Sequence, residues 1–230
     1  MNEDMLPGAE PGDGEAREPE SYLGCIVAGD EAAEAWDALE ERYGPAVAHY
    51  FQLRFEGRRT AEEIAEKFFE LMRAQAQETV PATLRPWLAT LQQQFVRHLY
   101  RRPEYSLTEL GKREGYGETE SDDAFDRDWA QQAMLGALKR FRKGYPQIHA
   151  LLLRVYDRAG GAPMPDKKQM ASLLGLSAAQ LESRLNEAHE ALRYELSKEL
   201  KHTVTTPEAL GAEREFLEPF LDPMFAALRT

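Results

Sequence analysis

Residues 84–102 combine arginines, aromatic residues and glutamines, and no acidic residue interrupts them. Arginines can neutralise phosphates, aromatic rings can stack on unpaired bases, and glutamine amides can read base edges. The side chains suited to this chemistry are Arg85, Trp87, Gln92, Gln93, Gln94, Phe95, Arg97, Tyr100, Arg101 and Arg102. The stretch is therefore either a nucleic-acid contact or an amphipathic helix with a solvated basic end, and both interpretations remain open at this point.

Glutamates recur at helical spacing just before this stretch, at Glu62, Glu63, Glu66 and Glu70. Residues three and four apart lie on the same side of a helix, so these carboxylates predict one acidic face. Such a face is either simply solvated or a docking surface for a basic partner.

Residues 165–200 predict two helices joined by a tight turn. Asp166 with Gln169, and Ser177 with Gln180, have the spacing of a capping box, and Gly175 can enter the left-handed conformation at little cost. The second helix carries an apolar stripe at Leu181, Leu185, Ala188, Leu192, Leu196 and Leu200. This is the outline of a helix-turn-helix, whose second helix can lie in a DNA major groove, although many αα-hairpins share the pattern.

No catalytic signature stands out, because the chain has no Gly-rich phosphate loop, His-Glu-x-x-His motif or serine elbow. The five histidines are scattered, without the spacing of metal ligands. We therefore expect no enzyme activity, no cofactor and no metal. A single cysteine, Cys25, excludes an internal disulfide and suits a reducing cytoplasm. No apolar run approaches the roughly 18 residues of a membrane span, so we expect a cytoplasmic protein without a membrane partner.

The net charge of −12 is concentrated at one end of the chain. Residues 1–41 hold 13 acidic groups against one basic group, Arg17, whereas 42–230 hold 27 of each sign. A basic groove elsewhere is therefore compatible with the acidic total. Residues 1–20 contain almost no large apolar groups, so we expect a disordered acidic tail.

The remaining periodicity is helical, without β-alternation of useful length, and predicts an all-α fold of two small helical domains joined by a flexible linker. The first domain is expected at 21–102. Proline, glycine and an acidic run predict the linker at 103–127. The second domain, with the helix-turn-helix, is expected at 128–204, and a C-terminal helical extension at 205–230, with Pro207 at the first position of its helix.

These pieces, in this order, resemble an extracytoplasmic-function (ECF) sigma factor of RNA polymerase, of the planctomycete-type subgroup. The resemblance covers about 21–220. Its motifs lie at Ile26–Asp30, 60–69, Trp87–Arg102, Phe125–Ala130, Gly175–Arg193 and Leu200–Val204 with Pro207 and Glu208. They correspond in turn to the start of sigma region 2, its polymerase-docking motif, the helix that captures the −10 element, the start of region 4, its helix-turn-helix and the tail of the subgroup.

The resemblance implies a sigma factor that binds core RNA polymerase and directs promoter recognition and transcription initiation. It implies three sets of contact residues. Polymerase would be bound by Glu62, Glu63, Glu66 and Phe69. The −10 DNA would be faced by Trp87, Gln93, Gln94, Arg97, His98, Arg101 and Arg102. The −35 groove would be faced by Lys167, Lys168, Gln180, Ser183 and Arg184. The expected partners are core RNA polymerase and promoter DNA, and the resemblance also allows an anti-sigma factor or a regulatory kinase.

The helix-turn-helix departs from the family pattern in its charges, so that region 4 is atypical. Glu182 and Glu187 stand where lysine and arginine are usual, and Gln180 and His189 replace threonine and arginine. Earlier in the chain, Glu66 replaces a usual glutamine, while Gln94 and His98 replace asparagine and aspartate. Because glutamates repel phosphates, the alternative is a degenerate sigma-like interaction protein, which binds polymerase or another protein without sequence-specific promoter recognition.

Overall fold

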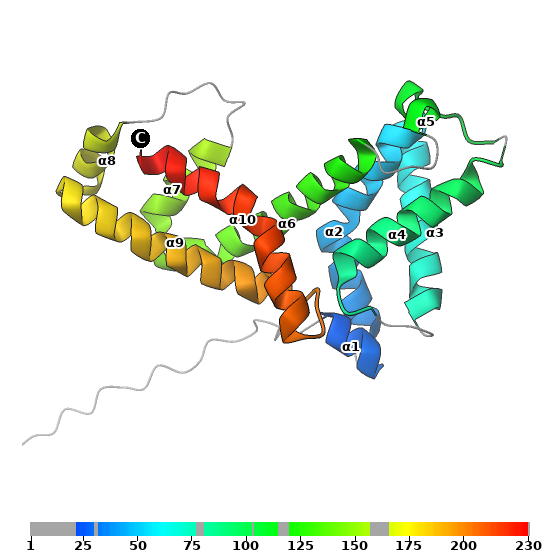
Figure 1. Ribbon diagram of the computed structural model, residues 1–230, viewed down its shortest axis with the longest axis horizontal. Coiled ribbons are helices and arrows are strands. Elements are labelled where there is room, and N and C mark those ends of the chain that lie inside the picture. The colour runs from blue at the N-terminus through cyan, green and yellow to red at the C-terminus, as the bar shows by residue number, and fades with distance from the viewer. Residues whose placement is uncertain are drawn as a thin grey trace, which may run out of the picture.

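The computed structural model describes residues 22–29, 32–76, 81–102, 104–114, 120–156 and 166–229. This part of the chain is helical, with two isolated β-bridges, so the expected all-α fold is confirmed (Figure 1). Its helices are α1 (Tyr22–Ala28), α2 (Ala32–Arg54), α3 (Arg58–Ala76), α4 (Leu84–Leu99), α5 (Glu109–Glu114), α6 (Glu120–Gly144), α7 (Pro146–Tyr156), α8 (Lys167–Leu174), α9 (Ala178–Lys201) and α10 (Pro207–Arg229). The tail expected at 1–20 lies outside the described residues.

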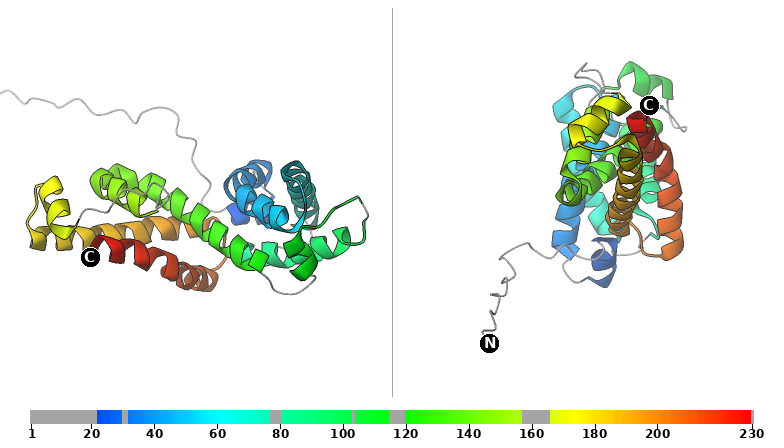
Figure 2. Two further views of the ribbon diagram at one scale, coloured as in Figure 1. Left: turned by 90° about the horizontal axis from the view of Figure 1, so that it is seen from above. Right: turned by 90° about the vertical axis from the view of Figure 1, so that its left-hand side faces the viewer.

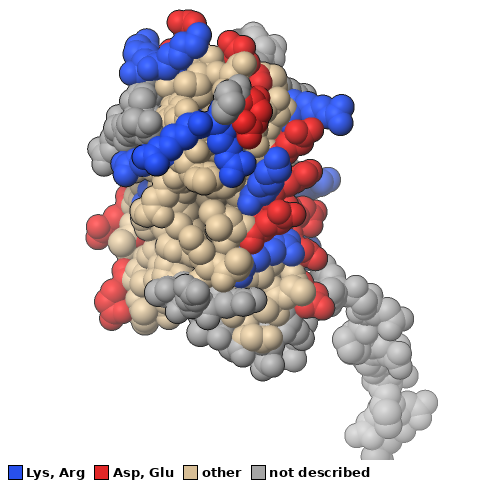
Figure 3. Space-filling model, turned by 90° about the vertical axis from the view of Figure 1, so that its right-hand side faces the viewer, with Lys and Arg blue, Asp and Glu red and all other residues tan. Residues whose placement is uncertain are grey.

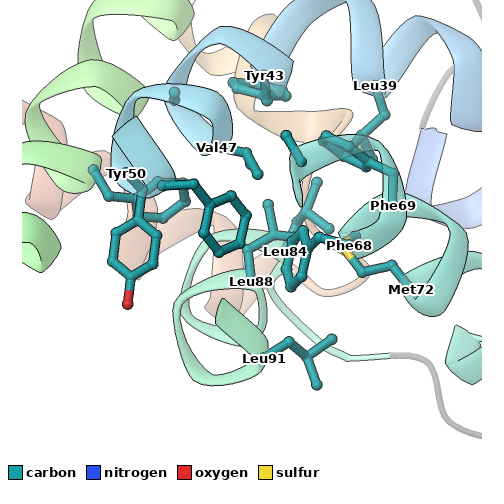
Figure 4. Close-up of a cluster of buried hydrophobic side chains, with 14 of the residues drawn as sticks. Leu39, Tyr43, Val47, Tyr50, Phe68, Phe69, Met72, Leu84, Leu88 and Leu91 are labelled. Carbon is teal, nitrogen blue, oxygen red and sulfur yellow. The ribbon is translucent and has the colours of Figure 1, made fainter. Parts of the chain in front are cut away.

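The first of two hydrophobic cores is enclosed by α1 to α4 and the beginning of α6. Residues at helical spacing on α2, such as Leu39, Tyr43 and Val47, are fully buried against Phe68 of α3 and Leu88 of α4 (Figure 4). Helices α2, α3 and α4 thus turn one apolar stripe inward and leave their other side in solvent. The outward sides of α3 and α4 carry the glutamates and arginines singled out in the sequence.

The second core is formed by the rest of α6 together with α7, α8, α9 and α10. The predicted stripe of α9 is buried, including Leu181, Leu185 and Leu192. Leu217 and Leu221 of α10 are buried in the same cluster. Helix α10, which was expected as an extension at 205–230, is therefore part of this core, and its helix does begin with Pro207.

Helix α6 runs through both cores, obliquely across the middle of the molecule (Figures 1 and 2). Phe125 and Trp129 are buried in the first core, and the same helix contributes Met134 and Phe141 to the second. The prediction of a flexible linker over 103–127 is not confirmed, because the described part of this stretch includes α5 and the first turns of α6. The acidic run that suggested a loop lies in the first turn of α6, where carboxylates favour a helix.

A buried carboxylate joins the two cores. Glu199 of α9 is 0% exposed and forms ion pairs with Arg42 of α2 and with Arg140 of α6, the latter at 2.7 Å. Gly136 of α6 faces it so closely that a Cβ atom there would lie 2.7 Å from the carboxylate carbon. The lack of a side chain at Gly136 therefore makes room for the pairing.

The connection between α9 and α10 also binds the first core through the backbone. The N–H of Leu84, at the start of α4, donates to the carbonyl of Thr203 at 2.9 Å. The N–H of Thr205 donates to the carbonyl of Ala82 at 3.0 Å. The ring of His202 stacks on Tyr22 of α1, with 4.7 Å between ring centroids. The two halves therefore pack against each other directly, and the first turn of α4 depends on the second half for a hydrogen-bond acceptor.

Candidate nucleic-acid interface

Helix α4 has the outer face that the sequence predicted for 84–102. Leu84, Leu88, Val96 and Leu99 are buried, which leaves the opposite side of the helix in solvent. The solvent side carries Gln94, Arg97 and His98, with Trp87 half-buried among them and Gln93 half-buried beside it. Figure 3 looks at the face of the molecule formed by α3 and α4.

The two arginines at the end of α4 extend this face beyond the helix. Arg101 and Arg102 are exposed in the turn that follows Leu99. Arg102 lies 3.0 Å from Nε2 of His98 and pairs with Glu104 at 3.8 Å. The structure therefore brings together the residues predicted to face −10 DNA, from Trp87 to Arg102.

Other residues of the same stretch have structural roles. Arg85 points inward, where its guanidinium binds Asp126 of α6 at 2.8 Å and Glu213 of α10 at 3.1 Å and lies 3.7 Å from the centroid of the Phe216 ring. Burial alone would lower the pKa of Arg85, but the hydrogen bonds and charges of its two carboxylate partners raise it overall. Phe95 packs against Phe51 and Phe68. Arg85 is thus engaged within the chain, and Phe95 is partly buried against the first core.

The acidic face of α3 also forms. Glu62, Glu63 and Glu66 are exposed, and Glu63 accepts a hydrogen bond from Arg59 at 3.2 Å. Phe69, which was grouped with them as a polymerase contact, is only 3% exposed and packs in the first core beside Phe68. It is a core residue that supports the acidic face from beneath, because its position one residue after Phe68 still falls on the buried side of the helix.

The helix-turn-helix has the local geometry that its sequence predicts. Both capping boxes are present: Asp166 and Ser177 each accept from the backbone of the glutamine three residues on, whose side chain reaches back. Gly175 ends α8 in the left-handed conformation, with φ of 67°. Helix α8 is therefore followed by a tight turn and by the long helix α9.

The residues expected to face the −35 groove are largely engaged within the chain. Lys167 pairs with Glu182 at 2.6 Å. The side chain of Gln180 is used in the capping box. Ser183 donates to Glu187 at 3.3 Å and Arg184 pairs with Glu187 at 3.1 Å, whereas Lys168 is exposed. The two glutamates that are unusual in the sequence thus neutralise cations that a DNA-binding helix would turn towards phosphates.

Beside this helix lies a groove that the sequence does not predict. A cavity of about 300 Å³ lies between the start of α7 and the α8–α9 turn. Its walls combine an apolar set with a polar set, namely Tyr145, Pro146, Ile148, Leu174 and Leu176 with Gln147, Gln180, Ser183, Arg184 and Glu187. The break at Gly144-Tyr-Pro146 predicts that a new helix starts there. Nothing in the sequence indicates that this helix, α7, lies near α9.

Among the described residues, no group of His, Cys, Asp and Glu side chains is arranged to hold a metal ion. In the same part of the chain, none of the helices has both the length and the apolar character needed to cross a bilayer. Comparison with protein-family models, with curated proteins and with solved structures gives no match.

Proposed function

We propose that this protein is an ECF-type sigma factor that binds core RNA polymerase through α3 and contacts promoter DNA through α4. The observation that carries the proposal is the outer face of α4, where Trp87, Gln94, Arg97 and His98 share a solvent-exposed side without an acidic residue. Arg101 extends it. The exposed glutamates of α3, on the neighbouring helix, fit a basic docking site on the polymerase.

The chemistry of the α4 face suits an unpaired strand. Arg97 and Arg101 can neutralise successive phosphates, which provides affinity but no sequence choice. The indole of Trp87 is held by the first core at its inner edge, so its exposed part offers a fixed surface on which a base can stack. The amide of Gln94 can then donate to and accept from a base edge.

A second candidate function is supported by the ion pairs of the helix-turn-helix. With Lys167 paired to Glu182 and Arg184 to Glu187, this hairpin presents few free cations to a DNA backbone. A sigma-like interaction protein, which docks on polymerase or another protein without choosing a promoter, would have this property.

The proposal is tested by co-purification with core RNA polymerase. Replacing Glu62 and Glu63 by lysine should abolish binding to the polymerase, while the helix survives, because losing each charge near its start costs only about 0.3–1 kcal/mol. The matched control reverses two exposed glutamates of α10, Glu208 and Glu215, and should co-purify normally. Unchanged binding by the α3 variant would refute the docking assignment.

A second arm separates the two candidates. A single-stranded promoter fragment is titrated by fluorescence anisotropy against the wild type and against the Arg97→Ala, Arg101→Ala variant. The slope of the logarithm of the binding constant against the logarithm of the salt concentration should become about 1.4 units shallower in the variant. Each phosphate contact to a single strand contributes about 0.7 to this slope. Lys139→Ala with Arg142→Ala, on the exposed side of α6, is the control. Polymerase binding without any effect of the α4 variant would favour the interaction protein.

A further inference from the structure

The first turn of α4 carries Trp87 and is held by the second half of the molecule. We propose that Arg85 and its partners on α6 and α10 are positioning residues, which set the orientation of the Trp87 indole towards an unpaired base. This inference rests on the function proposed for α4 and deepens it, because the second half then contributes to nucleic-acid binding without touching the nucleic acid.

The start of α4 lacks a cap of its own. Thr83 precedes the helix without a side-chain cap hydrogen bond, and Pro86 has no N–H group to donate. The N–H of Leu84 donates to the carbonyl of Thr203 at 2.9 Å, and an isolated β-bridge joins Thr83 to Val204. The backbone at the start of α4 is therefore held by the connection between α9 and α10.

The side chain of Arg85 adds contacts with α6 and α10. Its guanidinium binds Asp126 at 2.8 Å and Glu213 at 3.1 Å, and it lies 3.7 Å from the ring centroid of Phe216. Glu213 is only 2% exposed, so its pairing with Arg85 is shielded from water. Such a pair resists separation, because a buried charge that loses its partner is left uncompensated. Arg85 thus ties the first turn of α4 to two other helices.

Arg85 and Trp87 lie on opposite flanks of the buried side of α4. Successive residues of an α-helix are about 100° apart, which places these two side chains on either side of Leu84 and Leu88. Leu84 and Leu88 are 0% exposed and fix the depth of the helix in the first core. The contacts of Arg85 fix its rotation, because any turn about the helix axis that separates Arg85 from its carboxylates also turns the indole of Trp87.

The experiment compares a single-stranded DNA fragment with an abasic strand of the same length, by fluorescence anisotropy on the full-length chain. A base stacked on Trp87 should make the wild type prefer the strand with bases by about fivefold or more. Glu213→Ala should bring this preference close to one, because Arg85 loses its buried partner. Arg97 and Arg101 still contact phosphates, so the affinity for the abasic strand should not change.

Two further variants are compared with Glu213→Ala. Glu213→Gln keeps a side-chain oxygen that accepts from Arg85, and it should retain most of the preference for bases. Glu215→Ala removes an exposed carboxylate of the same helix and should leave the preference unchanged. Circular dichroism confirms that each variant keeps its helical content before the titrations are compared.

Quenching of tryptophan fluorescence by acrylamide follows the position of Trp87 without DNA. Trp36 is 6% exposed and Trp129 is 0% exposed, so the quencher reaches mainly Trp87. Quenching should increase in Glu213→Ala, as the indole turns away from the core, but not in Glu215→Ala.

The quenching decides the positioning role even where the wild type shows no preference for bases, a result that would refute the base contact in the proposed function instead. Three results in Glu213→Ala would overturn the positioning role: unchanged quenching, a preference for bases that persists, or an equal loss of affinity for both strands.

Discussion

At the scale of single residues, the charged groups buried between the two halves depend most on their neighbours. Removing a carboxylate such as Glu199 from water is costly unless charged partners compensate, and it has Arg42 and Arg140. Its carboxylate lies against Gly136 of α6, where there is no room for a side chain. Arg85, which looked like a phosphate ligand in the sequence, has the same kind of structural role with Glu213 and Asp126.

We expect Gly136→Ala to destabilise the protein by about 1–3 kcal/mol, the usual cost of overpacking. The added methyl group would meet the Glu199 carboxylate at 2.7–2.8 Å, and two arginines hold that carboxylate in place. Gly211→Ala in α10 is the control, because a Cβ atom there meets nothing within 4 Å. It should be neutral or stabilising by up to about 1 kcal/mol, as expected for glycine within a helix. Urea unfolding of both variants checks the prediction, and equal effects would contradict it.

Because Glu213 is a buried carboxyl group, we expect the stability of the protein to depend on pH. Burial raises its pKa above the ordinary value of 4.5, and Asp126 adds to this, while the hydrogen bonds from Arg85 oppose it. The folded chain therefore holds this proton more tightly than the unfolded chain. The contribution to stability is complete below about pH 4.5 and is lost as the pH rises through the folded pKa.

Comparison with Glu213→Gln isolates this contribution, because the other titrating groups cancel in the difference. The free energy of unfolding of the wild type, minus that of the variant, should increase as the pH is lowered from 8 to 5. Urea titrations at several pH values measure it. A difference that stays constant or decreases would show that the ion pair with Arg85 outweighs burial.

At the scale of elements, the strongest sequence signals are local ones. Both capping boxes and the left-handed Gly175 form as predicted, because each depends on residues within one turn of the chain. Thr60 and Glu63 also have the spacing of a capping box, but they lie inside α3, which already begins at Arg58, directly after Gly57 in the left-handed region at φ of 89°. Capping-box spacing therefore marks the start of a helix only where the helix has not already begun further upstream.

The cap of α9 is testable. Ser177→Ala should cost about 1 kcal/mol of stability, within the range of roughly 0.5–2 for lost N-caps, because the backbone N–H of Gln180 loses its acceptor. Ser177→Asp should retain most of this stability, because aspartate is also a good N-cap residue. Ser183→Ala, on the same helix but outside the cap, should change stability by less than about 0.5 kcal/mol. Thermal or urea denaturation distinguishes the three, and an equal loss at Ser183 would exclude a specific capping effect.

At the scale of the whole molecule, the two cores share one helix. Helix α6, the Glu199 ion pairs and the contacts of the α9–α10 connection with α4 all couple them. A domain boundary at residue 128 would cut α6, and one at residue 204 would remove α10 from the second core. The molecule is therefore expected to behave as one cooperative unit rather than as two tethered domains.

Equilibrium unfolding can test this coupling directly. Trp36, Trp87 and Trp129 all lie in or against the first core, so tryptophan fluorescence reports on that half, whereas far-ultraviolet circular dichroism reports on the helices of both. The two signals should give the same urea midpoint. Separate midpoints, with fluorescence changing while much of the helical signal remains, would show that the halves unfold independently.

The sequence by itself determined most of the helices with their buried stripes, the caps of the helix-turn-helix and the outer face of α4, but not α5 or the start of α6, which lie in the stretch predicted as a linker. These features depend on periodicity and on contacts within a few residues, which a linear pattern records. Only the tertiary structure decided which charged residues remain at the surface. Arg85 and Glu213 lie 128 residues apart, and Arg42 meets Glu199 across the two halves. Such pairs depend on how helices pack, because an arginine on a helix edge is equally suited to a phosphate or to a buried carboxylate until its neighbours are in place.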